Sequence, residues 1–301
     1  MEINLNDIQE QNKKIFLITG ANSGLGYETT KFLVKKGATV LMCCRNIVKG
    51  EKAKDKLLKS NYPGNIELIK LDLSDLSEVK LISKFIKNKY DYLDVLINNA
   101  GLMAPPKTIS KQGLEIQFAV NHLAHMSLSM ELLPLLNNKI DSRVITVTSG
   151  VQYFADIAWD DLQSRNKYDR WASYAQSKLA NVMFGLELNS LLIKRNSNTS
   201  SLLAHPGFAR TNLQPKSLEA NKSWQEKIAY KLMDPMFQSA RMGALPQIAA
   251  AILPSAKGGE QYGPKYSFRG YPRICKNAPK ALNKSFRKRL WTISEELIDN
   301  L

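Results

Sequence analysis

Short apolar runs alternate with longer amphipathic segments along most of this chain. The runs are rich in valine, isoleucine and leucine on both faces, which is typical of parallel strands buried under helices. They read KIFLIT, ATVLMCC, NIELIKL, LDVLINN, RVITVTS and SSLLAHPG, and a last short strand is expected near 261–268. Helices are expected at about 25–36, 48–59, 76–88, 114–136 and 172–194. This order predicts an α/β fold, a doubly wound parallel sheet of about seven strands with helices on both faces.

Glycine and polar residues follow each of the six apolar runs. These turns read TGANSG, RN, LDLSD, NNAG, TSG and HPG in chain order. In a doubly wound sheet, ligands bind beyond the carboxyl ends of the strands, where the strand order reverses. We therefore expect the turns to meet at one edge of the sheet and to form a ligand site there.

The composition is that of an ordinary globular protein, and a single domain is expected over residues 1–301. The chain is 44% hydrophobic and 23% charged, with no repeat or low-complexity tract. Its polar start, MEINLNDIQEQNKK, lacks the apolar region of a secretory signal. The most apolar helical candidate, 241–254, contains two prolines and is shorter than a spanning helix. We expect a cytoplasmic protein without a transmembrane segment.

Lysine and arginine exceed aspartate and glutamate by 42 to 27, and the excess concentrates in a basic C-terminal region at about 257–301. From Lys257 to Arg289 there are ten basic residues and one acidic residue, Glu260. No RNA-binding motif or recognition-helix pattern accompanies them, so a solvated basic face is favoured and no nucleic-acid partner is expected. Weak contact with a membrane surface stays open as an alternative.

The turn TGANSGLG places Gly20, Gly24 and Gly26 between the first strand and the first helix. Glycine lets the backbone approach a pyrophosphate, and the helix N-terminus offers unpaired N–H groups and a partial positive charge to it. The spacing differs from the common G-x-G-x-x-G fingerprint. Its position directly after an apolar strand predicts a dinucleotide-binding turn.

Residues after the second, third and fourth strands point to the adenosine half of a dinucleotide. Arg45 stands where an acid would accept the 2′-hydroxyl of NAD, and its guanidinium suits the 2′-phosphate of NADP, so we predict NADP(H). Asp72 is expected to accept from the adenine amino group, although it could instead cap the helix that begins near Asp75. Asn98 is expected to tie neighbouring strands together.

Tyr174 and Lys178, in SYAQSKLAN, lie four residues apart and so share one face of the expected helix. An ammonium beside the phenol would lower the tyrosine pKa toward working pH, which suits a general acid/base. Such a pair is common in helices by chance, but two further residues favour a catalytic role. Ser149 ends the fifth strand, and Asn121 is a poor helix former that stands within a long expected helix.

With these residues in view, the chain resembles the short-chain dehydrogenases/reductases. The motifs that carry the resemblance are TGANSGLG, NNAG, Asn121, Ser149 and YAQSK in this order, from about Lys13 to Gly207, and GALP, GP and GYP continue it. Within the family the chain is similar to retinol dehydrogenases, the WW-domain oxidoreductase and light-dependent protochlorophyllide reductases. The resemblance implies a Rossmann-like fold and an NADP-dependent enzyme acting on a CH–OH group or its carbonyl.

The resemblance also implies the roles of individual residues. Tyr174 would exchange the proton, Lys178 would hold the nicotinamide ribose, Ser149 would polarise the substrate oxygen, and Asn121 would anchor a proton-relaying water. The residues expected to contact the cofactor are Gly20, Asn22, Ser23, Gly24, Leu25, Gly26, Arg45, Asp72, Leu73, Asn99, Ala100, Gly101, Tyr174, Lys178, Pro206, Gly207 and Thr211.

The substrate is expected to be a lipophilic or aromatic small molecule. Its pocket would be built by the segment after Ser149, by LMAPP after Gly101 and by an insert at about 207–240. The side chains that suggest an apolar substrate are Gln152, Tyr153, Phe154, Trp171 and Phe208. Three histidines, not paired at metal spacing, are expected to be structural, and no metal site is expected: His122, His125 and His205.

Two alternatives stay open. One is a double-bond reductase resembling protochlorophyllide reductase, although Ala180 replaces the cysteine of that family's YKDSKVCN segment and argues against it. The other is a dinucleotide-bound regulatory protein without turnover, for which a broken catalytic set would be the sign. The apolar N-terminal anchor usual in membrane-bound retinol dehydrogenases is not expected here. A homodimer or homotetramer is expected from the family.

Overall fold

The computed structural model describes residues 8–211, 213–221, 226, 228, 231 and 234–300. All of its strands join one sheet in the order β3-β2-β1-β4-β5-β6-β7-β8. The strands are β1 (Ile15–Thr19), β2 (Thr39–Cys44), β3 (Asn65–Lys70), β4 (Val95–Asn98), β5 (Ser142–Val147), β6 (Thr199–Ala204), β7 (Gln261–Pro264) and β8 (Pro272–Cys275). The first seven are parallel, so the predicted doubly wound fold is confirmed.

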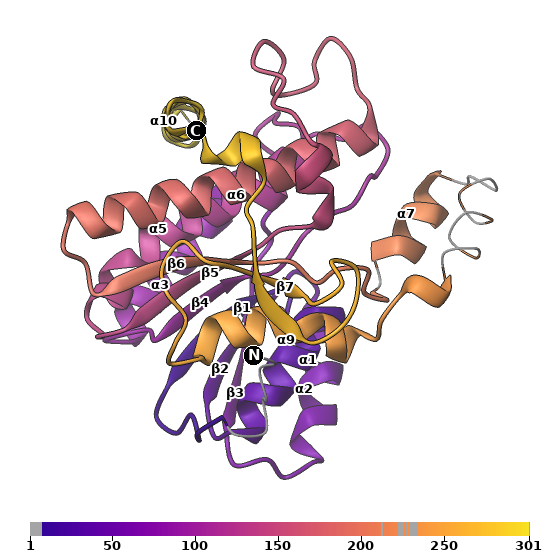
Figure 1. The fold of residues 1–301 in the computed structure, drawn as a ribbon. Coiled ribbons are helices and arrows are strands. Elements are labelled where there is room, and N and C mark those ends of the chain that lie inside the picture. Colours follow the sequence, from indigo (N-terminus) through magenta and orange to yellow (C-terminus); the bar gives the residue numbers. More distant parts are fainter. Residues whose placement is uncertain are drawn as a thin grey trace.

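The helices cover both faces of this sheet (Figure 1). On one face, α3 (Leu76–Lys89), α5 (Ala124–Asn137), α6 (Arg170–Lys194) and α10 (Lys284–Asp299) contribute to the larger apolar core. On the other face, α1 (Gly24–Lys35), α2 (Ile47–Leu58) and α9 (Ala240–Ile252) enclose the second core. Both faces of the central strands are therefore buried, as their valine- and leucine-rich sequences predict.

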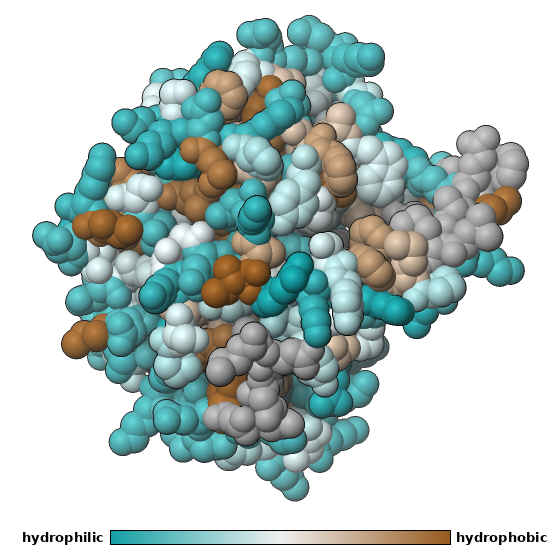
Figure 2. Space-filling view, viewed as in Figure 1, coloured by the Kyte–Doolittle hydropathy of each residue, from teal (hydrophilic) through white to brown (hydrophobic). Residues whose placement is uncertain are grey.

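Side-chain caps set where several helices begin. Asn46 accepts from the backbone of Lys49 at the start of α2, and Asp169 accepts from the first turn of α6. Such caps satisfy backbone N–H groups that have no partner within the helix. Hydrophilic side chains cover most of the face in Figure 2, with hydrophobic ones scattered among them.

The sheet has one strand more than expected. The expected strand at 261–268 ends at Pro264, where the chain enters a turn with Ser267 at φ 66° and Gly270 at φ 114°. The chain then returns as β8, which pairs antiparallel with β7. Proline at the end of β7 and glycine in the turn supply the geometry that reverses the chain.

The helix expected at 114–136 is not regular. It consists of α4 (Ile116–Phe118), a π-helical segment η2 (Ala119–Leu123) and α5. Asn121 lies in the π segment, and such widened turns occur often at functional sites. The short elements are α7 (Leu213–Asn221) and the 3-10 turns η3 (Gly150–Phe154), η4 (Asp234–Met236) and η5 (Pro279–Leu282). Parts of the insert at 207–240 lie outside the described residues.

Among the described helices, none combines the length and the apolarity that crossing a bilayer requires.

Candidate active site

The turns after β1 and β4 touch each other at the point where the strand order reverses. Gly20 has φ 64°, and a Cβ atom there would lie 3.0 Å from the Cα and Cβ atoms of Ala100. Gly26 is packed more tightly, because a Cβ atom there would lie 2.4 Å from the Gly20 carbonyl oxygen. The glycines thus serve two purposes: Gly20 permits a left-handed turn, and Gly26 permits close packing of α1 against that turn.

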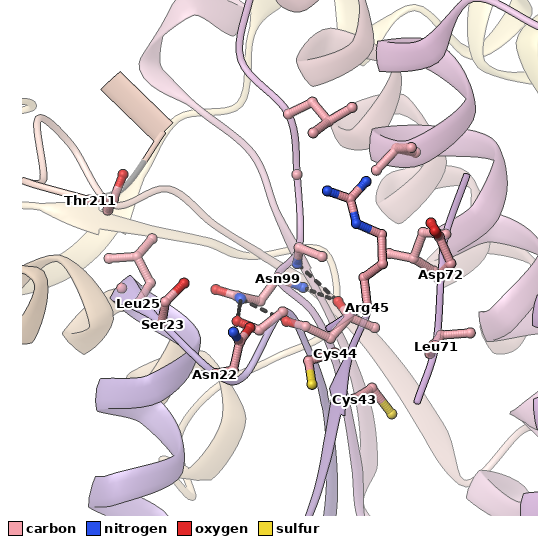
Figure 3. Close-up of a pocket in the computed structure, with 18 residues that line it drawn as sticks. Asn22, Ser23, Leu25, Cys43, Cys44, Arg45, Leu71, Asp72, Asn99 and Thr211 are labelled. Carbon is pink, nitrogen blue, oxygen red and sulfur yellow. Dashed lines mark hydrogen bonds between the residues drawn. The ribbon is translucent and has the colours of Figure 1, made fainter. Parts of the chain in front are cut away.

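A first cavity of about 200 Å³ lies over these turns (Figure 3). Ser23, at the cap position of α1, makes no side-chain cap hydrogen bond, and the first turn of α1 contains no acidic residue. The partial positive charge of this helix N-terminus therefore faces the cavity. Twelve of the predicted cofactor residues line it: Gly20, Asn22, Ser23, Gly24, Leu25, Arg45, Asp72, Leu73, Asn99, Ala100, Gly101 and Thr211. Gly26, by contrast, lies behind the turn and does not line it.

Arg45 and Asp72 lie together on one side of the first cavity, across from Thr211 (Figure 3). Asp72 accepts from the backbone and the hydroxyl of Ser74 at 2.9 and 2.7 Å. The cap of α3 is Asp75, whose carboxylate accepts from the backbone of Ser77. The capping alternative for Asp72 is therefore wrong, and its carboxylate remains at the cavity wall.

Asn98 does not tie neighbouring strands together, which corrects the sequence-based expectation. Its amide donates to the Ser129 hydroxyl of α5 at 2.8 Å. The next residue, Asn99, makes the connection instead, because its side-chain amide donates to the Thr19 carbonyl at 2.7 Å. The amide of Gln247 donates in turn to the Asn99 side chain at 3.2 Å. Successive side chains of an extended segment point to opposite sides, so one step in sequence exchanges the two roles.

Thr19 and Gln247 are parts of this region that the sequence patterns did not indicate, and His125, which was expected to be structural, lies beside Thr19. The His125 ring lies 2.9 Å from the Thr19 hydroxyl and 3.1 Å from the Asn121 carbonyl oxygen. Burial lowers the pKa of His125 to about 4, so the ring is neutral at pH 7. It therefore links the end of β1 to the π segment through neutral hydrogen bonds. Burial likewise lowers the pKa of His122 and His205.

A second cavity, of about 410 Å³, adjoins the first one. Leu25, Asn99, Gly101 and Thr211 line both. Its wall holds the predicted residues Ser149, Tyr174, Lys178, Pro206 and Gly207. The remaining lining is largely apolar and includes Met103, Val147, Val151, Trp171, Phe208, Ala209 and Phe237. Trp171, Tyr174 and Lys178 show that one face of α6 forms part of the wall of the second cavity.

Lys178 is buried in the wall of the second cavity, beside Gly101, which lines both cavities. Its Nζ donates to the Val147 carbonyl at 3.2 Å and lies 5.9 Å from the centre of the Tyr174 ring. Burial lowers the pKa of Lys178 to about 8. The indole of Trp171 packs edge-on with the Tyr174 ring, with the centroids 6.2 Å apart. The tyrosine ring thus has both an ammonium and an aromatic ring as neighbours.

Asn121 lies behind the cavity surface rather than on it. Its side-chain Oδ1 accepts from the Leu102 backbone N–H at 2.8 Å, and its side-chain Nδ2 donates to the Leu102 carbonyl and to the Ser177 hydroxyl. A Cβ atom on Gly101 would lie 3.2 Å from Asn121 Oδ1 and 3.5 Å from Lys178 Nζ. Glycine at this position therefore leaves only a thin backbone layer between Asn121 and the cavities.

Three residues expected in the substrate pocket do not line it. Gln152 is buried, Tyr153 donates to the Lys276 carbonyl at 2.7 Å, and Phe154 is 92% exposed. They belong to η3, which turns them away from the cavity, whereas Val151 of the same turn does line it. Ala180 is fully buried in the larger core and also lines neither cavity.

The insert contributes lining residues that no sequence pattern indicated: Gln214, Glu226 and Phe237. Glu226 forms an ion pair with Arg170 and accepts from the Trp171 indole N–H at 3.2 Å. This carboxylate therefore connects the insert to the first turn of α6. The contact depends on residues more than fifty positions apart, which is why periodicity and motif spacing do not reveal it.

Sequence comparisons place these features in a known family. Residues 14–222 match the short chain dehydrogenase family. Human retinol dehydrogenase 12 is 34% identical over 288 residues, covering 95% of this chain and 86% of that protein. The human WW domain-containing oxidoreductase is 33% identical over 295 residues, covering 95% of this chain and 68% of that protein.

Solved structures agree in fold. An uncharacterised protein from Mycobacterium paratuberculosis superposes with a TM-score of 0.81 at 33% identity, covering 99% of this chain and 98% of that one. The RhlG/NADP active-site complex of Pseudomonas aeruginosa has a TM-score of 0.66 at 22% identity, covering 84% and 95%. The chain belongs to the short-chain dehydrogenase family of NAD(P)(H)-using oxidoreductases.

Proposed function

We propose that this protein is an NADP(H)-dependent oxidoreductase that interconverts a carbonyl and an alcohol on a lipophilic or aromatic small molecule. The observation that carries the proposal is the junction of the two cavities. Lys178, Tyr174 and Ser149 line an apolar cavity, and that cavity meets a glycine-lined one at Gly101 and Thr211. The apolar second cavity provides room for a substrate, and the glycine-lined first cavity has the lining that a dinucleotide requires.

The residues of the first cavity fit the cofactor. The left-handed turn at Gly20 and the N-terminus of α1 suit a pyrophosphate, because backbone N–H groups and the helix dipole both favour an anion there. Arg45 is exposed at the end of β2, where its guanidinium can form charge-assisted hydrogen bonds with a 2′-phosphate. When bound, the dinucleotide supplies or accepts the hydride at the carbon that carries the substrate oxygen.

The protein's own residues handle the proton and the position of the substrate oxygen. Tyr174 gives a proton to that oxygen during reduction and takes it back during oxidation. The Lys178 ammonium favours the ionised phenol electrostatically, and the Ser149 hydroxyl donates a hydrogen bond that polarises the carbonyl. Val147, Val151, Phe208 and the indole of Trp171 exclude water from this step because they form the apolar wall.

The catalytic part of the proposal is tested with purified protein, by following the oxidation of NADPH and NADH with a panel of aldehydes, ketones and retinoids. Tyr174→Phe removes the proton donor and is expected to lower kcat at least about 100-fold, the lower range for general acid catalysis. Tyr92→Phe serves as the control, because it removes only a hydrogen bond to the Lys13 carbonyl. Cofactor binding without turnover of any substrate would instead favour the non-catalytic alternative.

The cofactor part has a separate readout. Arg45→Ala is expected to weaken NADPH binding about 10-fold or more and to leave NADH binding nearly unchanged, since only NADPH offers a phosphate to the guanidinium. Equilibrium titration of cofactor fluorescence measures both constants. Tighter binding of NADH than NADPH by the unaltered protein would refute the preference for NADP(H).

A further inference from the structure

The turn that follows β4 is fastened at both ends by side chains from other elements. The Thr19 hydroxyl oxygen, at the end of β1, accepts from the backbone N–H groups of Asn99 and Ala100, each at 2.9 Å. The backbone of Leu102 donates to the Asn121 side chain at 2.8 Å and accepts from it at 3.0 Å. The position of this turn therefore depends on Thr19 and Asn121.

The imidazole of His125, on α5, connects these two supports. It lies 2.9 Å from the Thr19 hydroxyl and 3.1 Å from the Asn121 backbone carbonyl oxygen. A carbonyl oxygen only accepts, so Nδ1 carries the ring proton and Nε2 is left as an acceptor. The ring is also neutral at pH 7, because burial lowers the pKa of His125 to about 4.

The Thr19 hydroxyl has one proton to donate, and its oxygen already accepts from two backbone N–H groups of the turn. His125 Nε2 is the nearer acceptor for that proton, because the Ile97 carbonyl oxygen lies 3.5 Å away. The bond to His125 thus orients the hydroxyl so that its oxygen faces the turn. Removal of the imidazole would leave the hydroxyl free to rotate and would weaken its hold on the turn.

The turn that His125 supports borders both cavities. Asn99, Ala100 and Gly101 line the first cavity (Figure 3), and Asn99 and Gly101 also line the second. A Cβ atom on Gly101 would lie 3.5 Å from Lys178 Nζ. His125 itself is buried and lines neither of these cavities. A change at His125 would therefore act on a bound dinucleotide through the turn and not by contact.

We propose that His125 is a positioning residue for the dinucleotide: its hydrogen bond to Thr19 holds the turn at 99–102 in the form that the dinucleotide binds. Without that bond, binding would also have to order the turn, and the affinity would fall. The inference rests on the proposed function, because it takes the first cavity to be the dinucleotide site.

Equilibrium titration of NADPH into the full chain measures this effect without any substrate. His125→Leu is expected to raise the Kd for NADPH about fivefold or more, the equivalent of one hydrogen bond. His125→Gln should recover most of the affinity, because its amide oxygen can stand near the place of Nε2 and accept from Thr19. His125→Asn is too short to reach Thr19 and should bind NADPH as weakly as the Leu variant. No recovery by Gln, or recovery by Asn alone, would overturn the proposal.

A double-mutant cycle tests the path through Thr19. Thr19→Val removes the hydroxyl with little change in volume and should itself weaken NADPH binding. In that background His125→Leu should change the Kd by less than about twofold, because both substitutions interrupt the same hydrogen bond. Additive losses would show that His125 acts independently of Thr19 and would refute the proposal.

His122→Leu is the matched control. His122 is as buried as His125, but its Nε2 lies 2.9 Å from the Ser294 hydroxyl of α10 and not beside the turn. This variant should lower the free energy of unfolding and leave the Kd for NADPH within about twofold of the unaltered value. Equal weakening of NADPH binding by the two Leu variants would overturn the proposal in favour of a general loosening of the core.

Urea unfolding establishes which variants are folded before their Kd values are compared. If His125→Leu does not fold, the comparison of His125→Gln with His125→Asn decides the matter. An unaltered protein that binds neither NADPH nor NADH would refute the proposed function and this inference with it. If the unaltered protein binds NADPH and folded His125→Leu binds it equally well, only the role of His125 is refuted.

Discussion

At the scale of single residues, Lys178 is the most consequential side chain. It is buried, its Nζ donates to the Val147 carbonyl, and burial lowers its pKa to about 8. Below that pH the ammonium is charged in both the folded and the unfolded chain, so the desolvation of the buried charge lowers the free energy of unfolding by its full amount. Between about pH 8 and the unfolded value of about 10.4, the unfolded chain binds more protons, and stability from this group rises with pH.

We therefore expect Lys178→Met to raise the free energy of unfolding at pH 7, by an amount on the order of 3 kcal/mol. The gain should shrink as the pH rises through 8 toward about 10, because the lysine of the unaltered protein then loses its charge. Urea unfolding at several pH values measures this difference. Lys178→Arg, which stays charged over the range, should show no such convergence, and a Met variant that is no more stable at pH 7 would contradict the expectation.

At the scale of elements, the insert is held against the start of α6. Asn221 and Ser217 of α7 donate to the Ala104 carbonyl, and Glu226 reaches Arg170 and the Trp171 indole. Since Trp171 packs on Tyr174, Glu226 is connected to the proposed proton donor through an intermediate ring. The insert thus contacts the first turn of α6 besides lining the cavity.

Glu226→Ala is expected to lower kcat/KM about 10-fold, because it removes a partly buried ion pair and the hydrogen bond that orients Trp171. Steady-state kinetics and the fluorescence of Trp171 measure the two effects. Glu219→Ala, which alters an exposed carboxylate of α7, is the matched control and should leave kcat/KM unchanged. The same kinetic loss in both variants would show that Glu226 has no positioning role.

At the scale of the whole molecule, a buried ion pair joins the C-terminal helix α10 to α6. Arg287 of α10 donates to Glu187 of α6 at 3.0 Å, with both side chains less than one-tenth exposed. The rings of Trp291 and Phe184 stack beside it, with their centroids 5.8 Å apart. The last helix is therefore part of the larger core and not an appendage.

Glu187→Ala is expected to lower the free energy of unfolding by about 3–5 kcal/mol, because it leaves the guanidinium of Arg287 buried without its anion. The double variant Glu187→Leu, Arg287→Met should recover most of the loss, since neither buried charge remains. Urea unfolding of the single and double variants provides the comparison. A double variant as unstable as the single one would show that shape, and not charge, accounts for the effect.

Motif and periodicity gave the parallel strands and most of the first cavity, because these depend on neighbours in sequence. The glycines after β1 and the polar ends of β2 and β3 reach one edge of the sheet in any doubly wound fold. The sequence was less informative at β8, at η3 and at Asn98. At Asn98 a shift of one residue along the strand reverses the side to which the side chain points. At β8 and η3 the chain turns, and the turn decides which way the side chains point.

The order of the seven parallel strands, the glycine turn and the family were determined by the sequence alone, since local patterns encode them. The tertiary structure decided that Asn121 is hydrogen-bonded to Leu102 and Ser177, that Phe154 faces solvent, and that Glu226 reaches α6. These outcomes depend on contacts between segments far apart in the chain. No local pattern carries such contacts, because they exist only once the two cores have packed around the sheet.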